Sequence, residues 1–147
     1  MQMLYTRSMG TQRLEKLARE LGARDPGLEA TLADVRQAVE QLRGLVDTLA
    51  GAFKRTAREA GAAHLANLEV GPVEPDEKHI DCIQFRVARG RWEIVCVAKA
   101  KGNVTLVGPF RRGKPEKPCA DHPLRGTETE QALEDLLVRL IEAASER

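Results

Sequence analysis

Two pairs of histidine and cysteine have the spacing of zinc ligands. His79 and Cys82 are separated by two residues, and so are Cys119 and His122. Imidazole nitrogens and thiolate sulfurs bind structural zinc, four at a time in a tetrahedron. However, His79 and Cys82 enter a predicted strand, in which residues three apart point to opposite faces. A zinc-stabilised module is therefore the weakest of three functional hypotheses, and the sequence predicts neither a metal nor another cofactor.

Cys119, Asp121 and His122 also place a nucleophile and a base close together in the sequence. A catalytic cysteine needs a base that a third group orients inside a cleft, and adjacency along the chain supplies neither. The chain contains no glycine-rich phosphate loop and no nucleophile elbow. We therefore expect a protein that is not an enzyme.

Basic side chains gather near predicted turns in the second half of the chain. Residues 86–117 contain nine lysines and arginines against two glutamates, although the net charge is only +1. Cations at turns can meet phosphates without being buried. The candidate anion-binding or nucleic-acid-binding residues are Arg89, Arg91, Lys99, Lys101, Arg111, Arg112 and Lys114. A small nucleic-acid-binding protein is the alternative function, and a solvated sheet face is the plainer interpretation of the same residues.

The elements that would position these residues begin with strands. From residue 80, apolar and polar residues alternate, which is typical of a half-buried strand. The Arg89-Gly90 pair and the Lys101-Gly102-Asn103 segment predict turns. The sequence therefore predicts a three-stranded antiparallel meander. Its inner face would carry Ile83, Phe85, Val87, Trp92, Ile94 and Cys96.

A C-terminal helix follows the predicted meander. Leucines at 133, 136, 137 and 140 have helical spacing, and Thr127 marks the start of this helix. Three strands cannot bury both of their faces, so we expect this helix to pack on the apolar face of the sheet. The predicted fold class is α+β.

One long helix carries the most regular pattern in the chain. Its apolar residues follow a heptad rhythm and are Leu28, Leu32, Val35, Val39, Leu42, Val46, Leu49 and Phe53. A shorter amphipathic helix with Leu14 and Leu17 precedes it, and the short connection predicts an antiparallel helical hairpin. A helix with such a stripe needs a partner to cover it.

The residues beside the heptad stripe do not determine what packs against it. One flank carries Ala38 and Leu45 rather than charges, so it lacks the ion pairs that specify a parallel coiled coil. A stripe of this width also suits a helix in a bundle or against a sheet. We take a self-associating assembly or adaptor module as the leading functional hypothesis. Its expected partner is a second copy in a homodimer, and another protein is the alternative.

The chain divides by pattern into three parts. Residues 1–70 form the predicted helical hairpin or assembly arm, 71–79 a linker, and 80–147 the meander with its helix, which would share one cooperative domain with the long helix. Three widely spaced cysteines make a poor disulfide framework and suit a reducing compartment. No apolar run reaches the length of a membrane span, and residues 1–10 lack a secretory signal. The expected location is the cytoplasm, with no membrane partner.

Overall fold

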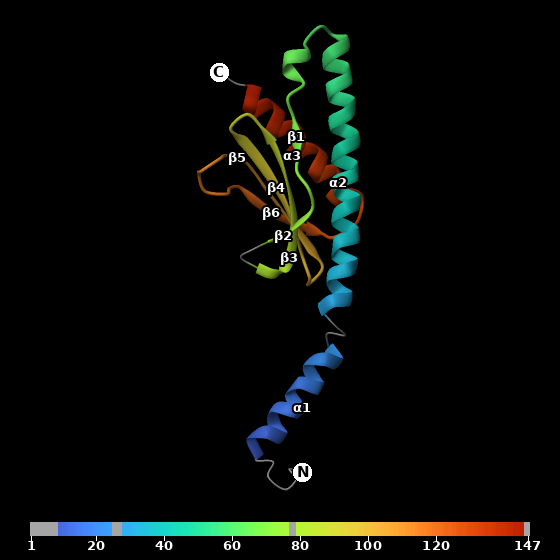
Figure 1. The fold of residues 1–147 in the computed structure, drawn as a ribbon, viewed down its shortest axis with the longest axis vertical. Helices are drawn as coiled ribbons and strands as arrows, with labels where there is room; N and C mark the ends of the chain where they lie inside the picture. The colour runs from blue at the N-terminus through green and yellow to red at the C-terminus, as the bar shows by residue number, and fades with distance from the viewer. Residues whose placement is uncertain (1–8, 25–27, 77–78, 146–147) are drawn as a thin grey trace.

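The computed structural model of the chain describes the backbone of residues 9–24, 28–76 and 79–145, and the side chains of 11–20, 32–76 and 81–145. Figure 1 shows how the elements of these segments are arranged. The helices are α1 (Met9–Arg24), α2 (Leu28–Glu59), the short 3-10 helix η2 (Ala63–Leu65) and α3 (Thr127–Ser145). The strands are β1 (Glu69–Val70), β2 (Glu74–Asp76), β3 (His79–Arg89), β4 (Trp92–Lys99), β5 (Asn103–Arg111) and β6 (Cys119–Pro123).

The strands form one antiparallel sheet in the order β1-β3-β4-β5-β6, with β2 also paired to β3. The α+β class is confirmed, but the prediction of a three-stranded sheet is wrong, because the sheet has six strands. The predicted meander forms its centre as β3, β4 and β5. The other three strands are short and mostly exposed, and β2 and β6 contain proline. Backbone pairing holds such edge strands without an alternating pattern, so periodicity did not reveal them.

The helical hairpin is a second feature that differs from the prediction. Among the described residues, α1 contacts no other element. Figure 1 shows α1 continuing beyond the N-terminal end of α2 instead of folding back along it. The predicted linker, residues 71–79, contains β2, and β2 pairs antiparallel with β3.

The main core lies between the sheet and two helices. Both α2 and α3 contact β3 and β4, and they also contact each other. Along β3 the alternation predicted from the sequence holds, with Ile83, Phe85 and Val87 buried in this core. The other strands and α3 contribute Ile94, Cys96, Ala98, Val104, Leu106, Leu133, Leu136, Leu137 and Leu140. One face of the sheet is therefore covered by helices, as the sequence predicted.

A smaller apolar cluster lies on the opposite face of the sheet. Val95 pairs with Val107 in the register of β4 and β5, and both are buried together with Phe110. The register shifts by one residue between Glu93 and Val95, which places a bulge in β5 next to this cluster. Gly108 lies in the bulge with a φ of +109°, a conformation that glycine adopts readily.

Within the described residues, no helix combines the length and the apolar character needed to cross a bilayer.

Candidate functional site

The heptad stripe of α2 lies inside the chain's own core. Val35, Val39, Leu42 and Val46 are buried, and the remaining described members, Leu32, Leu49 and Phe53, are partly buried. The Leu28 side chain lies outside the described residues. Because α2 contacts β3, β4 and α3, these elements cover the stripe. The described part of the surface that the sequence assigned to assembly thus packs mostly within one chain, and its remaining exposed area belongs to the partly buried Leu32, Leu49 and Phe53.

The candidate basic residues divide between the two ends of the sheet. The main-chain N–H of Arg112 donates to the carbonyl of Arg91 at 2.8 Å, which joins the end of β5 to the turn between β3 and β4. Lys99 and Lys101 lie at the other end of β4, eight residues or about 25 Å away along an extended strand. Arg89, Arg91, Arg111, Arg112 and Lys114 belong to the first group. The seven residues do not form one patch.

Several of these arginines already have partners. Arg112 makes an ion pair of 2.9 Å with Glu93, and the guanidinium of Arg111 lies 5.5 Å from the centre of the Trp92 ring. Arg89 is largely buried, because its exposed fraction is only 7%. Arg91, Arg111, Arg112 and Lys114 are exposed. Three of the five residues, Arg89, Arg111 and Arg112, thus make contacts within the fold, and only Arg89 is buried.

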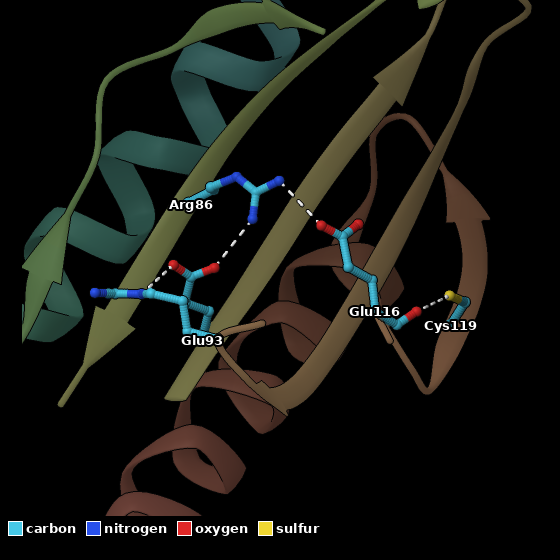
Figure 2. Close-up of polar contacts among 5 residues, drawn as sticks. Arg86, Glu93, Glu116 and Cys119 are labelled. Carbon is cyan, nitrogen blue, oxygen red and sulfur yellow. Dashed lines mark hydrogen bonds and ion pairs between the residues drawn. The ribbon is translucent and has the colours of Figure 1, made fainter. Parts of the chain in front are cut away.

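An ion-pair network crosses the face of the sheet that the helices leave uncovered. Figure 2 shows Arg86 of β3 between Glu93 of β4 and Glu116, which lies between β5 and β6. Arg86 contacts Glu93 at 3.0 Å and Glu116 at 3.1 Å. The Glu93 side chain is only 12% exposed, so its two ion pairs are partly shielded from water. Burial by itself lowers the pKa of Arg86, but the hydrogen bonds and charges of Glu116 and Glu93 raise it overall.

The cysteine and histidine residues do not come together. Cys82 lies on β3 and Cys119 on β6, with β4 and β5 between them. The side chain of His79 lies outside the described residues. Among the residues that are described, no group of three or more His, Cys, Asp or Glu side chains is placed to hold a metal ion. The zinc hypothesis therefore gains no support.

The thiol of Cys119 faces a backbone oxygen rather than a catalytic base. Its Sγ donates to the carbonyl of Glu116 at 3.3 Å (Figure 2). His122 is three residues along the same strand and faces the other side of the sheet. Asp121 instead accepts a hydrogen bond from the hydroxyl of Thr105, and this bond lowers the pKa of Asp121. These three residues are not arranged as a catalytic triad.

The α1 helix presents an apolar face that sequence reasoning had assigned to the hairpin. The side chain of Leu14 is 68% exposed and that of Leu17 is 48% exposed. These leucines lie with Arg13 and Glu20 along one open side of the helix, and we call these four residues the arm face. The amphipathic spacing of the leucines was visible in the sequence, but nothing in it showed that α2 would leave them uncovered.

Arg89 is the functional candidate whose surroundings differ most from the expectation. Its Nη1 donates to the carbonyl oxygens of Leu65 at 2.6 Å and Asn67 at 2.7 Å. Its guanidinium lies 5.4 Å from the centre of the Phe53 ring on α2. Burial lowers the pKa of Arg89. Arg89 thus ties the chain after η2 to the end of the sheet.

Comparison with known protein families, with curated proteins and with solved structures finds no match for this chain.

Proposed function

We propose that this protein is a non-enzymatic assembly module that forms a homodimer through the arm face of α1. The observation that carries the proposal is the pair of exposed leucines, Leu14 and Leu17, on a helix that contacts no other described element. The proposal keeps the self-association expected from the sequence but moves the contact from the heptad stripe of α2 to α1.

The length of α1 supports the need for a partner. With 16 residues, α1 is only slightly longer than the roughly 12–15 residues below which an isolated helix is marginal in water. Most of the stability of such a helix comes from burying its apolar side, and burying a leucine contributes roughly 1.5–3 kcal/mol. A second helix over Leu14 and Leu17 supplies this stabilisation.

The charges beside the leucines favour a second copy of the same helix in the antiparallel direction. When Leu14 packs against Leu17 of the second copy, Arg13 lies beside Glu20 of the second copy, and symmetry repeats this ion pair. A parallel pair instead places Arg13 beside Ala18 and gains no ion pair. Arg13 and Glu20 are both exposed in the single chain and therefore accessible to such contacts.

Sedimentation of the full chain over a concentration series tests the proposal. We expect the wild type to dimerise as the concentration rises, and a Leu14→Asp, Leu17→Asp double variant to remain monomeric. The matched control is Val138→Asp on α3, because Val138 is 49% exposed and similarly apolar. This control should dimerise like the wild type. A wild type that stays monomeric at hundreds of micromolar, or a double variant that still dimerises, overturns the proposal.

A charge exchange tests the antiparallel direction separately. Arg13→Glu should weaken the dimer, because it places two acids beside each other. Adding Glu20→Arg to the same chain should restore the dimer, because the ion pairs return with opposite sign. Failure of the second change to restore association would exclude this arrangement of the helices.

The nucleic-acid alternative has less support from the geometry. Its seven candidate residues lie at two ends of the sheet, and Arg89 and Arg112 are engaged within the chain. A phosphate-directed surface needs neighbouring free cations. We therefore do not extend the proposal to nucleic acid.

A further inference from the structure

The side chain of Arg89 is a buried cation without an acidic partner. Buried arginines are normally paired with a carboxylate, because an isolated charge is costly to remove from water. Among the described residues, no carboxylate makes an ion pair with Arg89, and the two acceptors of Nη1 are neutral backbone carbonyls. No acidic side chain that the structure describes therefore compensates this positive charge.

Two nitrogens of the same guanidinium remain available. Within the described part of the chain, Nε and Nη2 of Arg89 have no hydrogen-bond partner. Both nitrogens retain some contact with solvent. Among the described residues, the one fully buried side-chain polar atom without a hydrogen-bond partner is Asn103 Oδ1, and neither nitrogen of Arg89 belongs to that class. Together Nε and Nη2 form the edge of the guanidinium fork that binds two oxygens of one planar or tetrahedral anion.

Arg89 also lines a cavity. It has a volume of about 330 Å³ and is lined by His64, Asn67, Arg89, Arg91, Trp92 and Ser145, among others. No acidic residue is among its described lining residues, and Arg91 adds a second positive charge. The indole of Trp92, which is partly buried, offers an apolar wall beside the cations. The volume is at the lower end of small-molecule sites, and such a hollow is too small for a polymer.

We propose that this cavity binds the oxyanion group of a small molecule, a carboxylate or a phosphate, on the Nε–Nη2 edge of Arg89. The anion supplies the negative charge that no described acidic side chain provides to Arg89. Arg91 strengthens the attraction at the cavity mouth, and Trp92 contacts the apolar part of the ligand. The site is independent of the arm face, because it is built from η2, the turn between β3 and β4, and the end of α3.

The fluorescence of Trp92 provides a direct readout, because it is the single tryptophan of the chain. The purified full chain is titrated with sodium phosphate, with sodium benzoate and with sodium chloride at matched ionic strength. We expect a saturable change with phosphate or with benzoate and none with chloride. The oxyanion that saturates at the lower concentration identifies the source of the ligand group. No saturable change with either oxyanion, or the same change with chloride, overturns the proposal.

Two variants connect the signal to the site. Arg89→Lys keeps the charge and a donor for the backbone carbonyls but loses the two-nitrogen edge, so binding should weaken at least about tenfold. Ala144→Leu leaves Arg89 intact and fills the cavity from α3, so it should abolish binding even if Arg89→Lys fails to fold. Lys101→Ala, at the far end of the sheet, should titrate like the wild type. If both cavity variants bind as the wild type does, the site is excluded.

Discussion

Glu93 joins two arginines that come from different parts of the sheet. Arg86 makes an ion pair with Glu93, although the register places Ala88 opposite Glu93 and Arg86 opposite Val95. The contact is therefore diagonal across the strands. The second partner, Arg112, was not predictable, because it depends on how the chain turns after β5. One candidate anion-binding residue is thus neutralised within the fold.

The sequence indicated the buried position of Arg89, but the residue was interpreted as part of a surface turn. It continues the alternation of Ile83, Phe85 and Val87, so its side chain points to the helix-covered face. Its charge and its position before a glycine favoured a turn on the surface instead. Hydrogen bonds to the carbonyls of Leu65 and Asn67 make the buried position tolerable, and no sequence pattern specifies such backbone acceptors.

The thiol of Cys96 makes stability depend on pH. Burial raises the pKa of this thiol from 9.0 to about 12. Between these two values the unfolded chain has lost the proton while the folded chain keeps it. The free energy of unfolding should therefore fall as pH rises through this window, by about 1 kcal/mol per pH unit. Urea unfolding at several alkaline pH values measures the slope.

Cys96→Val is the matched control for this prediction, because valine has a similar volume and no proton to lose. The difference in slope between the wild type and Cys96→Val cancels the contributions of other titrating groups, including Cys82, whose pKa burial also raises. Equal slopes for the two proteins would show that the Cys96 thiol does not resist ionisation.

At the scale of elements, α2 shows that a periodic pattern can predict the apolar face of a helix but not what covers that face. The heptad spacing located the apolar side of the helix correctly, and the wide stripe with Ala38 on its flank suited a helix in a bundle or against a sheet as well as an assembly interface. Ala38 is indeed buried. Periodicity states that a face must be covered, but it does not state whether the cover belongs to the same chain.

A substitution in the heptad stripe tests whether the stripe is covered by the same chain or by a second copy. Val39 is fully buried in the core, so Val39→Ala should lower the free energy of unfolding by roughly 2 kcal/mol and leave the association state unchanged. Urea unfolding and sedimentation measure the two quantities. Arg36→Ala, on the exposed side of α2, should change neither by more than about 0.5 kcal/mol. If Val39→Ala abolished association without lowering the free energy of unfolding, the stripe would be an interface between two chains.

The bulge in β5 depends on Gly108. A Cβ added there would lie 2.8 Å from the main-chain oxygen of Glu93, in addition to the strained positive φ. Gly108→Ala should therefore destabilise the fold by roughly 1–3 kcal/mol, measured by thermal or urea unfolding. Gly44→Ala in α2 is the contrasting change, because its Cβ would meet no atom within 4 Å, and it should stabilise by up to about 1 kcal/mol. Equal effects of the two changes would contradict this assignment.

At the scale of the whole molecule, local patterns predicted the centre and long-range contacts determined the rest. The central strands and α3 follow from their periodicity. The contact of Arg125 with Asp34, at 2.9 Å, joins the segment before α3 to the first turns of α2 across 91 positions of sequence. Neither residue belongs to a motif. The pairing of β6 with β5 likewise depends on the path of the intervening chain.

The two edges of the sheet have a consequence for how far the chain can polymerise. At one edge β6 follows Pro118 and ends at Pro123, and neither proline has an N–H to donate to a further strand. At the other edge β1 and β2 are only two and three residues long. Such edges are poor templates for fibre growth. The proposed antiparallel contact of two α1 helices is isologous, so it closes on itself and assembly ends at two copies instead of continuing into a filament.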